Sequence, residues 1–312
     1  MSERTYWFAL ASVEGVGPIR IKKLLHRFGS IEAIFEAELS ELARVPLFNP
    51  LLAARVLKAR IRLAEFRRQI KWFQRQGIET LCPEDADYPE LLKTIPDAPP
   101  ILCKKGTLSH ISPKAVAIVG TTHPSDAGIL TTLELATLFS QAGFTVVSGL
   151  ARGIDTTAHC GALSTNGTTI GVLGCDLFSV YPSENRDLAA QICEHGALLS
   201  EHPFATQATP ANLIVRNRII SGLSMATIVV ESSANGGAVR TGRLALEQNR
   251  GLFACDWGVS NRFSEGPRRL IQEGAYALSP SRLAEAVELL LQPDGLKKAQ
   301  AAQATSEQMR LF

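Results

Sequence analysis

Between residues 112 and 291, short apolar runs alternate with longer segments in which apolar residues recur at helical spacing. We expect the apolar runs to be strands, at residues 116–119, 145–148, 169–173, 197–200, 226–230 and 252–254. We expect the longer segments to be helices, at residues 128–141, 154–163, 185–193, 217–224 and 241–249. Strands that alternate with helices of this length indicate βαβ crossovers and a parallel sheet covered on both faces. The pattern therefore predicts an α/β domain over residues 112–291.

The first 75 residues have a different pattern, with short amphipathic helices expected at residues 6–10, 19–28 and 31–35. The break Gly15-Val16-Gly17 before a basic helix has the form of a helix-hairpin-helix, whose glycines let backbone N–H groups approach a phosphate. A small helical module used for packing or partner contacts is the alternative. Residues 55–75 are strongly basic, and their apolar residues predict one or two helices with a cationic face, either solvated or in contact with phosphate. We predict a helical domain over residues 1–75.

Two further segments lie outside these domains. Residues 76–111 combine short strands at 78–81 and 101–103 with turns so rich in proline that a continuous helix is forbidden. We expect a connecting module that packs on the sheet as a lid or brace. After a short helix at residues 282–291, the run 293–307 is polar and rich in alanine. Its shortage of large apolar residues predicts a flexible tail over residues 292–312.

The composition is that of an ordinary globular protein of 312 residues, 46% of them hydrophobic and 20% charged. No stretch approaches the ~20 apolar residues that span a bilayer. The first residues lack the basic-then-apolar pattern of a signal peptide, so we expect a cytoplasmic protein with no membrane partner. The six cysteines form no CxxC pair and no histidine stands at metal-ligand spacing, which predicts a reduced protein without a metal site. A net charge of +2 argues against a uniformly basic surface but allows a local basic patch.

Polar turns follow four of the expected strands, at the carboxyl ends where open α/β sheets bind ligands. The first turn is Gly120-Thr121-Thr122. It departs from the GxGxxG pattern, and no acidic residue ends the second strand, so we expect no dinucleotide and no other cofactor. Its backbone amides, with Ser125 nearby, suit a phosphate. The alternative is that Ser125 or Asp126 caps the next helix.

The second turn supplies Ser148, Gly149, Arg152 and Gly153 ahead of a helix that starts near Asp155. The glycines permit close backbone approach, and the Arg152 guanidinium offers a fork of donors suited to phosphate. The alternative is that Arg152 pairs with Asp155 and that the motif only shapes the turn.

The third cluster, Arg216-Asn217-Arg218, is expected at the start of a helix. The helix dipole does not favour cations there, so an anionic partner is one explanation of these arginines. An internal carboxylate, Glu201 or Glu231, is the other.

The fourth turn contains Gly236 and Gly237, with Arg240 and Arg243 on the helix that follows. Small residues and arginines at the carboxyl end of a strand again suit an anion. No nucleophile stands beside a base, and His159 and His202 are isolated in the sequence, so we expect no catalytic residues and no enzyme activity.

Four motifs occur in order along the chain: Ser148-Gly149-x-Ala151-Arg152-Gly153-Ile154-Asp155-x-x-Ala158-His159, Tyr181-Pro182-x-Glu184-Asn185, Ser200-Glu201-x-Pro203 and Arg216-Asn217-Arg218-Ile219-Ile220-Ser221-Gly222-Leu223-Ser224. Together they resemble the DprA/Smf family of DNA-processing proteins, over about residues 5–280. The resemblance implies a SAM or helix-hairpin-helix domain and an extended Rossmann-like domain that binds single-stranded DNA without catalysis. It also implies a homodimer that loads the RecA recombinase during natural transformation. By the resemblance Gly120, Arg216 and Arg218, with Arg152, line the DNA pocket.

This sequence departs from the family's pattern in several places. Thr122 stands where members usually carry an arginine, and Arg240 stands where an apolar residue is typical. The segment 254–258, Ala-Cys-Asp-Trp-Gly, replaces a usual Val-Pro-Gly. We expect none of the C-terminal winged helices that many members add. These changes are expected to weaken DNA affinity or to re-aim the pocket.

The last residues, Gln308-Met309-Arg310-Leu311-Phe312, resemble the pentapeptide by which many bacterial replication proteins bind the sliding clamp. Gln308, Met309, Leu311 and Phe312 are the expected clamp contacts, with leucine and aromatic anchors entering a pocket. Two other functions stay open at this point. One is a nucleotide-binding or nucleotide-cleaving Rossmann-like enzyme, and the other is a replication-linked or defence-linked paralogue recruited by the clamp.

Overall fold

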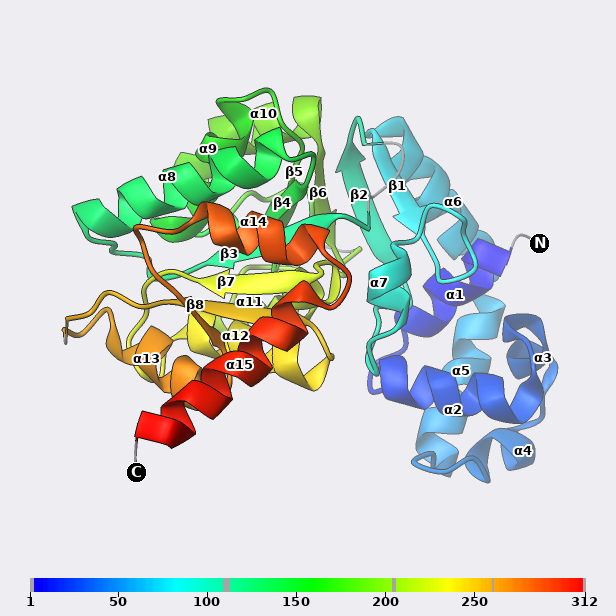
Figure 1. The fold of residues 1–312 in the computed structure, drawn as a ribbon. Helices are drawn as coiled ribbons and strands as arrows, with labels where there is room; N and C mark the ends of the chain where they lie inside the picture. Colours follow the sequence, from blue (N-terminus) through cyan, green and yellow to red (C-terminus); the bar gives the residue numbers. More distant parts are fainter. Residues whose placement is uncertain (1–2, 109–112, 204–205, 260, 311–312) are drawn as a thin grey trace.

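The structure, a computed structural model, describes residues 3–108, 113–203, 206–259 and 261–310. Its centre is a nine-stranded sheet with the order β1-β2-β6-β5-β4-β3-β7-β8-β9 (Figure 1). The strands from β3 to β9 pair in parallel: β3 Ala115–Val119, β4 Thr145–Ser148, β5 Thr169–Val172, β6 Ala197–Ser200, β7 Ala226–Val229, β8 Gly251–Cys255 and β9 Tyr276–Leu278. The predicted α/β fold with a parallel sheet is confirmed.

Helices cover both faces of the parallel strands (Figure 1). One face carries α8 Asp126–Gln141, α9 Ile154–Leu163, α10 Arg186–His195 and α14 Ala284–Leu291, and the other carries α11 Pro210–Gly222, α12 Gly237–Glu247 and α13 Glu265–Gln272. Alternate residues of each strand pack on opposite faces: Val116 and Ile118 lie in the core under α8 and α9, while Ala117 and Val119 lie in the core under α11 and α12. A sheet buried on both faces explains why its strands are continuous apolar runs.

The connecting segment extends the sheet, which corrects the prediction of a lid or brace. Strand β1 (Ile78–Leu81) pairs antiparallel with β2 (Leu102–Gly106), and β2 pairs antiparallel with β6. Without β2, the backbone groups of β6 would form an open sheet edge. The short helix α7 (Glu90–Lys93) follows β1 and contacts α11. The predicted strand at 101–103 therefore exists, but its role is to continue the sheet.

The N-terminal domain consists of short helices that pack on one another, as predicted: α1 Glu3–Ala11, α2 Pro18–Phe28, α3 Ile31–Glu36, α4 Leu39–Ala43, α5 Pro50–Ile61 and α6 Leu63–Arg75. Its aromatic core continues into the edge of the sheet, since Phe66 and Phe73 share one buried cluster with Ile78 and Leu198. In the hairpin before α2, Arg20 donates to the carbonyl of Gly15 at 2.8 Å. This hydrogen bond joins Arg20, in the first turn of α2, to the hairpin that precedes the helix.

The last segment contradicts the prediction of a flexible tail, because residues 295–310 form helix α15. Alanine, lysine and glutamine are strong helix formers, and few large apolar residues are needed when polar side chains fasten the helix. Gln303 accepts from the Ala277 amide at 2.9 Å, and Leu296 is buried. Gln308 and Met309 lie in the last turn of α15, whereas Leu311 and Phe312 lie outside the described residues. The clamp-binding prediction stays a prediction.

Two elements of the sheet domain escaped prediction. Strand β9 has three residues, too few for an alternating pattern, and α13 contains Pro267 and two arginines that interrupt its apolar spacing. Among the described helices, none is long and apolar enough to cross a membrane.

Candidate functional site

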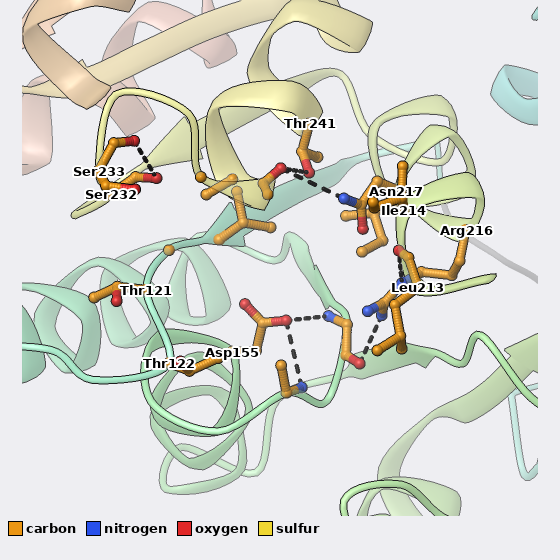
Figure 2. Close-up of a pocket in the computed structure, with 18 of the residues that line it drawn as sticks. Thr121, Thr122, Asp155, Leu213, Ile214, Arg216, Asn217, Ser232, Ser233 and Thr241 are labelled. Carbon is orange, nitrogen blue, oxygen red and sulfur yellow. Dashed lines mark hydrogen bonds between the residues drawn. The ribbon is translucent and has the colours of Figure 1, made fainter. Parts of the chain in front are cut away.

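A cavity of about 330 Å³ opens at the carboxyl ends of β3, β4 and β7 (Figure 2). The turns after these strands form its floor and walls, and α11 lies over it. Of the site residues predicted from the sequence, those that line it are Gly120, Thr121, Thr122, Gly149, Arg216, Asn217, Gly236 and Gly237. The prediction that these turns converge on one edge of the sheet is therefore confirmed. The predicted site residues that do not line the cavity are Ser148, Arg152, Gly153, Arg218, Arg240 and Arg243.

Arg216 is buried beside this cavity and bonds to the backbone around it. Its Nη1 donates to the carbonyl of Gly149 at 2.6 Å and to that of Val172. A Cβ on Gly149 would lie 2.0 Å from this nitrogen, so the glycine makes room for the arginine. Burial lowers the pKa of Arg216, although the Asp155 carboxylate opposes that shift. The guanidinium ties two strand ends together at the base of the site.

The arginine cluster does not stand at a helix start, which corrects the sequence prediction. Helix α11 begins six residues before Arg216, at Pro210, where the Thr209 side chain accepts from the Asn212 amide. A capping threonine followed by proline is the start signal that the prediction overlooked. The dipole argument for an anionic partner at Arg216 therefore fails.

Arg218 points away from the cavity into an internal ion pair. Its Nη1 and Nη2 each donate to the Glu201 carboxylate at 2.7 Å, and its Nε lies 3.0 Å from Asp97 Oδ2. Burial acts to lower the pKa of Arg218, but these carboxylates outweigh burial and raise it. Residues two apart in a helix are about 200° apart around its axis, so Arg216 and Arg218 cannot face one site. The alternative of an internal carboxylate is the one observed for Arg218.

Asp155 fills the amide pocket of the second turn. Its Oδ2 accepts from the amides of Gly149 at 3.1 Å and Ala151 at 3.4 Å (Figure 2). Burial raises the pKa of Asp155, against the attraction of Arg216. Arg152 does not pair with Asp155, because it lies on the surface and pairs with Glu184. The explanation that Arg152 pairs with Asp155 is therefore wrong, and its contact with phosphate stays a prediction.

The remaining residues of that turn have structural roles. The Ser148 hydroxyl donates to the Ile118 carbonyl at 2.7 Å. Gly153 has a φ of +72°, and a Cβ there would lie 2.5 Å from the Thr121 carbonyl. The glycine is required because the first and second turns pass so close to each other.

A carboxylate also occupies the start of α8. Glu231 accepts from the Ser125 amide at 2.9 Å and from the Ser125 hydroxyl at 2.5 Å. The same hydroxyl accepts from the Gly128 amide at 3.1 Å, so the capping alternative for Ser125 is confirmed. The Glu231 carboxylate thus lies at the start of this helix, where its negative charge opposes the approach of a second anion.

Helix α12, by contrast, begins at the cavity with no side-chain cap and no acidic residue in its first turn. Its first residues Gly237 and Ala238 line the cavity together with Thr241. Asn217 and Thr241 both donate to the Gly237 carbonyl, at 3.4 and 3.1 Å, and hold this turn in place (Figure 2). First-turn N–H groups have no partner within their own helix and carry the positive end of its dipole. The start of α12 is therefore suited to an anion.

The two arginines predicted on α12 lie outside the cavity. Arg243 pairs with Glu273 at 2.7 Å. Arg240 is exposed, and no ion pair holds it within the described residues. Several residues that were not predicted from the sequence also line the cavity, namely Tyr181, Leu213, Ile214, Ser232, Ser233 and Thr241. Tyr181 belongs to the Tyr-Pro motif, which was the available signal.

His159 and His202 have surroundings that favour the neutral imidazole. His159 is fully buried and hydrogen-bonded to Thr169 at 2.7 Å, and burial with the nearby Arg216 lowers its pKa to about 3. Burial also lowers the pKa of His202. Neither histidine borders the cavity. Over the described ranges, no group of three His, Cys, Asp or Glu side chains is placed to hold a metal ion.

The sequence matches the models of two protein families. The family model of the DNA recombination-mediator protein A matches residues 79–288, and that of the SAM-like helix-hairpin-helix tandem matches residues 9–60. The chain is 38% identical over 281 residues to protein Smf of Synechocystis sp., which covers 89% of this chain and 70% of that protein. It is 38% identical over 212 residues to the DNA processing protein DprA of Bacillus subtilis, covering 68% and 71%.

Solved structures agree with these matches. The X-ray structure of DNA processing protein A from Streptococcus pneumoniae superposes with a TM-score of 0.75 at 29% identity, covering 90% of this chain and 96% of that one. DNA processing protein A from Helicobacter pylori, whose structure concerns its single-stranded DNA binding mode, superposes with a TM-score of 0.61 at 27% identity, covering 69% and 95%. The predicted helix-hairpin-helix and Rossmann-like architecture is confirmed. This chain belongs to the DprA/Smf family of DNA recombination-mediator proteins.

Proposed function

We propose that this protein binds single-stranded DNA at the cavity, without chemical change to the DNA, and delivers the strand to RecA. In this proposal a DNA phosphate sits at the start of α12, where Gly237 and Ala238 line the cavity. The observation that carries this proposal is that α12 begins at the cavity without a side-chain cap, while protein carboxylates accept from the Ser125 amide before α8 and from the Gly149 amide before α9. Support from outside this chain comes from its relative in Helicobacter pylori, described by its single-stranded DNA binding mode.

Apolar groups at the mouth of the cavity suit the base that belongs to that phosphate. Tyr181 is 48% exposed and Ile214 is 39% exposed, and both line the cavity. Aromatic faces accept any base, so contacts of this kind favour single strands without sequence preference. Arg216 adds positive charge below, but Asp155 lies beside it, so the net charge of the cavity floor is small. The α12 amides therefore provide the main attraction for phosphate.

Thr122 matters because the family pattern has an arginine at this position. It lines the cavity, and its hydroxyl hydrogen-bonds to His123 Nδ1 at 2.9 Å. A threonine offers phosphate a hydroxyl but no charge. We expect weaker binding at low salt than in a relative with an arginine there, and a smaller salt dependence.

The proposal is tested at Gly237, where an added Cβ meets no atom within 4 Å. Gly237→Asp places a carboxylate in the first turn of α12, which suits the helix but repels phosphate. A like charge at about 4 Å in a site of intermediate dielectric costs up to about 4 kcal/mol, so we expect oligodeoxythymidine affinity to fall at least tenfold. Gly237→Asn has nearly the same shape without the charge and serves as the control. Equal affinities of the two variants would overturn the placement of the phosphate.

The competing function is that of a nucleotide-binding or nucleotide-cleaving enzyme. Thermal unfolding with mononucleotides and with oligodeoxythymidine separates the two, because a ligand that binds only the folded state raises its stability. We expect stabilisation by the oligonucleotide and none that saturates with a mononucleotide. The opposite result would favour the nucleotide enzyme.

Delivery to RecA and a homodimer are part of the same proposal. The family is that of recombination mediators, which fits a protein that places a recombinase on a bound strand. We expect the protein to speed RecA assembly on single strands covered by a single-strand-binding protein, and to do so as a dimer in light scattering. If Gly237→Asp abolished DNA binding yet left RecA assembly unchanged, the two activities would not be linked.

A further inference from the structure

A pair of half-exposed aromatic rings lies where the helical domain meets the sheet domain. Trp72 on α6 is 48% exposed, and Phe178, in the loop after β5, is 45% exposed. Their ring centroids are 5.0 Å apart, and Phe178 also stacks on Phe73, which is buried, at 5.7 Å. Large aromatic rings left open in this way mark a surface that binds a partner.

The loop that carries Phe178 is held in a fixed shape. Asp176 is buried, and its Oδ1 accepts from the amides of Phe178 at 2.9 Å and Ser179 at 3.0 Å. Its Oδ2 accepts from the Thr206 amide at 2.9 Å. The exposed ring is therefore presented by a preorganised backbone, which lowers the entropy cost of binding.

The surface beside the rings is cationic. A shallow cavity of about 620 Å³ is lined by Phe178 together with Lys105 and Arg186, and its described lining contains no carboxylate. Neither cation forms an ion pair within the described residues. On α6, Arg68 and Arg75 stand four residues before and three after Trp72, so they share one face of the helix with it. Aromatic rings among unpaired cations are suited to single-stranded nucleic acid.

This surface and the first cavity are lined by neighbouring residues of one loop. Residues 177–180 line the second cavity, and the next residue, Tyr181, lines the first. A strand leaving the first cavity past Tyr181 thus meets Phe178 within one short loop.

We propose that bound single-stranded DNA continues from the first cavity over the Trp72–Phe178 pair, where a base stacks, while Lys105 and Arg186 neutralise the phosphates. The inference rests on the proposed function and extends its site to the helical domain. A protein partner for the same rings is the competing occupant, but the unpaired cations and the loop shared with Tyr181 favour the nucleic acid.

Two lengths of oligodeoxythymidine test this path, one of about 5 nucleotides that fills the first cavity and one of about 20 that reaches both surfaces. With Trp72→Ala and Phe178→Ala combined, we expect affinity for the long strand to fall about 5- to 150-fold, the loss of one stacked base, and affinity for the short strand to stay constant. With Lys105→Ala and Arg186→Ala, the salt slope for the long strand should fall by about 1.4, at about 0.7 for each phosphate contact. Lys297→Ala with Lys298→Ala on α15, far from α6 in Figure 1, is the matched control.

Tryptophan fluorescence gives a second readout that does not depend on the stability of an alanine variant. Of the three tryptophans, Trp7 is 3% exposed, and Trp257 is partly buried, bonds to the Val230 carbonyl and lines neither cavity, so quenching by a stacked base should come from Trp72. We expect quenching with the long strand, and Trp72→Phe should keep long-strand affinity within about twofold while most of the quenching disappears. If affinity for the long strand survived the loss of both rings while Gly237→Asp still weakened binding, this inference would be wrong and the proposed function would stand. Failure of both strands to bind the unmodified protein would overturn the proposed function as well.

Discussion

Replacing Arg218 by alanine should destabilise the fold and leave DNA affinity unchanged. The Arg218 side chain is 7% exposed and donates twice to Glu201, which is 14% exposed, at 2.7 Å. Its Nε also lies 3.0 Å from Asp97, which is 38% exposed. Arg218 is absent from the lining of the first cavity, so its charge does not face the proposed phosphate site.

The cost follows from what the truncation leaves behind. Removing one partner of a buried ion pair leaves an uncompensated charge and costs about 3–5 kcal/mol. Asp97 is open enough to be hydrated, so Glu201 carries most of the penalty and we expect about 3 kcal/mol. Removing both charges, in Arg218→Met with Glu201→Gln, should cost about 1 kcal/mol or less. The difference between the variants measures the unpaired carboxylate.

Urea unfolding measures the free energy of unfolding, with an unchanged m value showing that the denatured states match. Fluorescence anisotropy with oligodeoxythymidine then measures affinity under conditions in which each variant is folded. If Arg218→Ala were as stable as the unmodified protein, the ion pair would be unimportant. If it bound DNA as weakly as Gly237→Asp, Arg218 would belong to the DNA site and the present assignment would be wrong.

Three further predictions concern other parts of the chain. Thr122→Arg should tighten single-strand binding and steepen its salt slope by about 0.7, and an unchanged slope would place the phosphates elsewhere. The pKa of His159, about 3 when folded against 6.5 when unfolded, means that the unfolded chain takes up the proton first, so stability falls as pH falls below 6.5. Between pH 6.5 and 5 this residue should contribute a loss of about 2 kcal/mol, which His159→Asn should lack in urea titrations. Deleting residues 308–312 should abolish binding to the sliding clamp in surface plasmon resonance and spare DNA binding, and clamp binding that persists would end that prediction.

The apolar patterns predicted the sheet well because its strands are buried on both faces. Strands β4 and β6 and helix α9 match the predicted residues, since each apolar run ends at a glycine or a polar turn. Element α15 was missed because its stability comes from helix propensity and from contacts such as that of Gln303 with the Ala277 amide, neither of which needs apolar residues.

The edge of the sheet that carries the site was predicted, but not every contact of the side chains there. The turns at Gly120 and Gly149 were located because glycine at a strand end is visible in the sequence. Glu201 was named as an alternative partner of the arginines and does pair with Arg218, whereas Asp97 was not named because it lies more than a hundred residues away in the sequence. The 200° separation of Arg216 and Arg218 was available from helical geometry alone, once the helix start was placed correctly at Thr209-Pro210.

The most direct test of the central claim is the structure of the protein bound to a short oligodeoxythymidine. The proposal predicts a phosphate within hydrogen-bond distance of the Gly237 and Ala238 amides, with the Arg218–Glu201 pair intact. A phosphate bound instead by Arg218, or a strand that leaves the start of α12 empty, would contradict it.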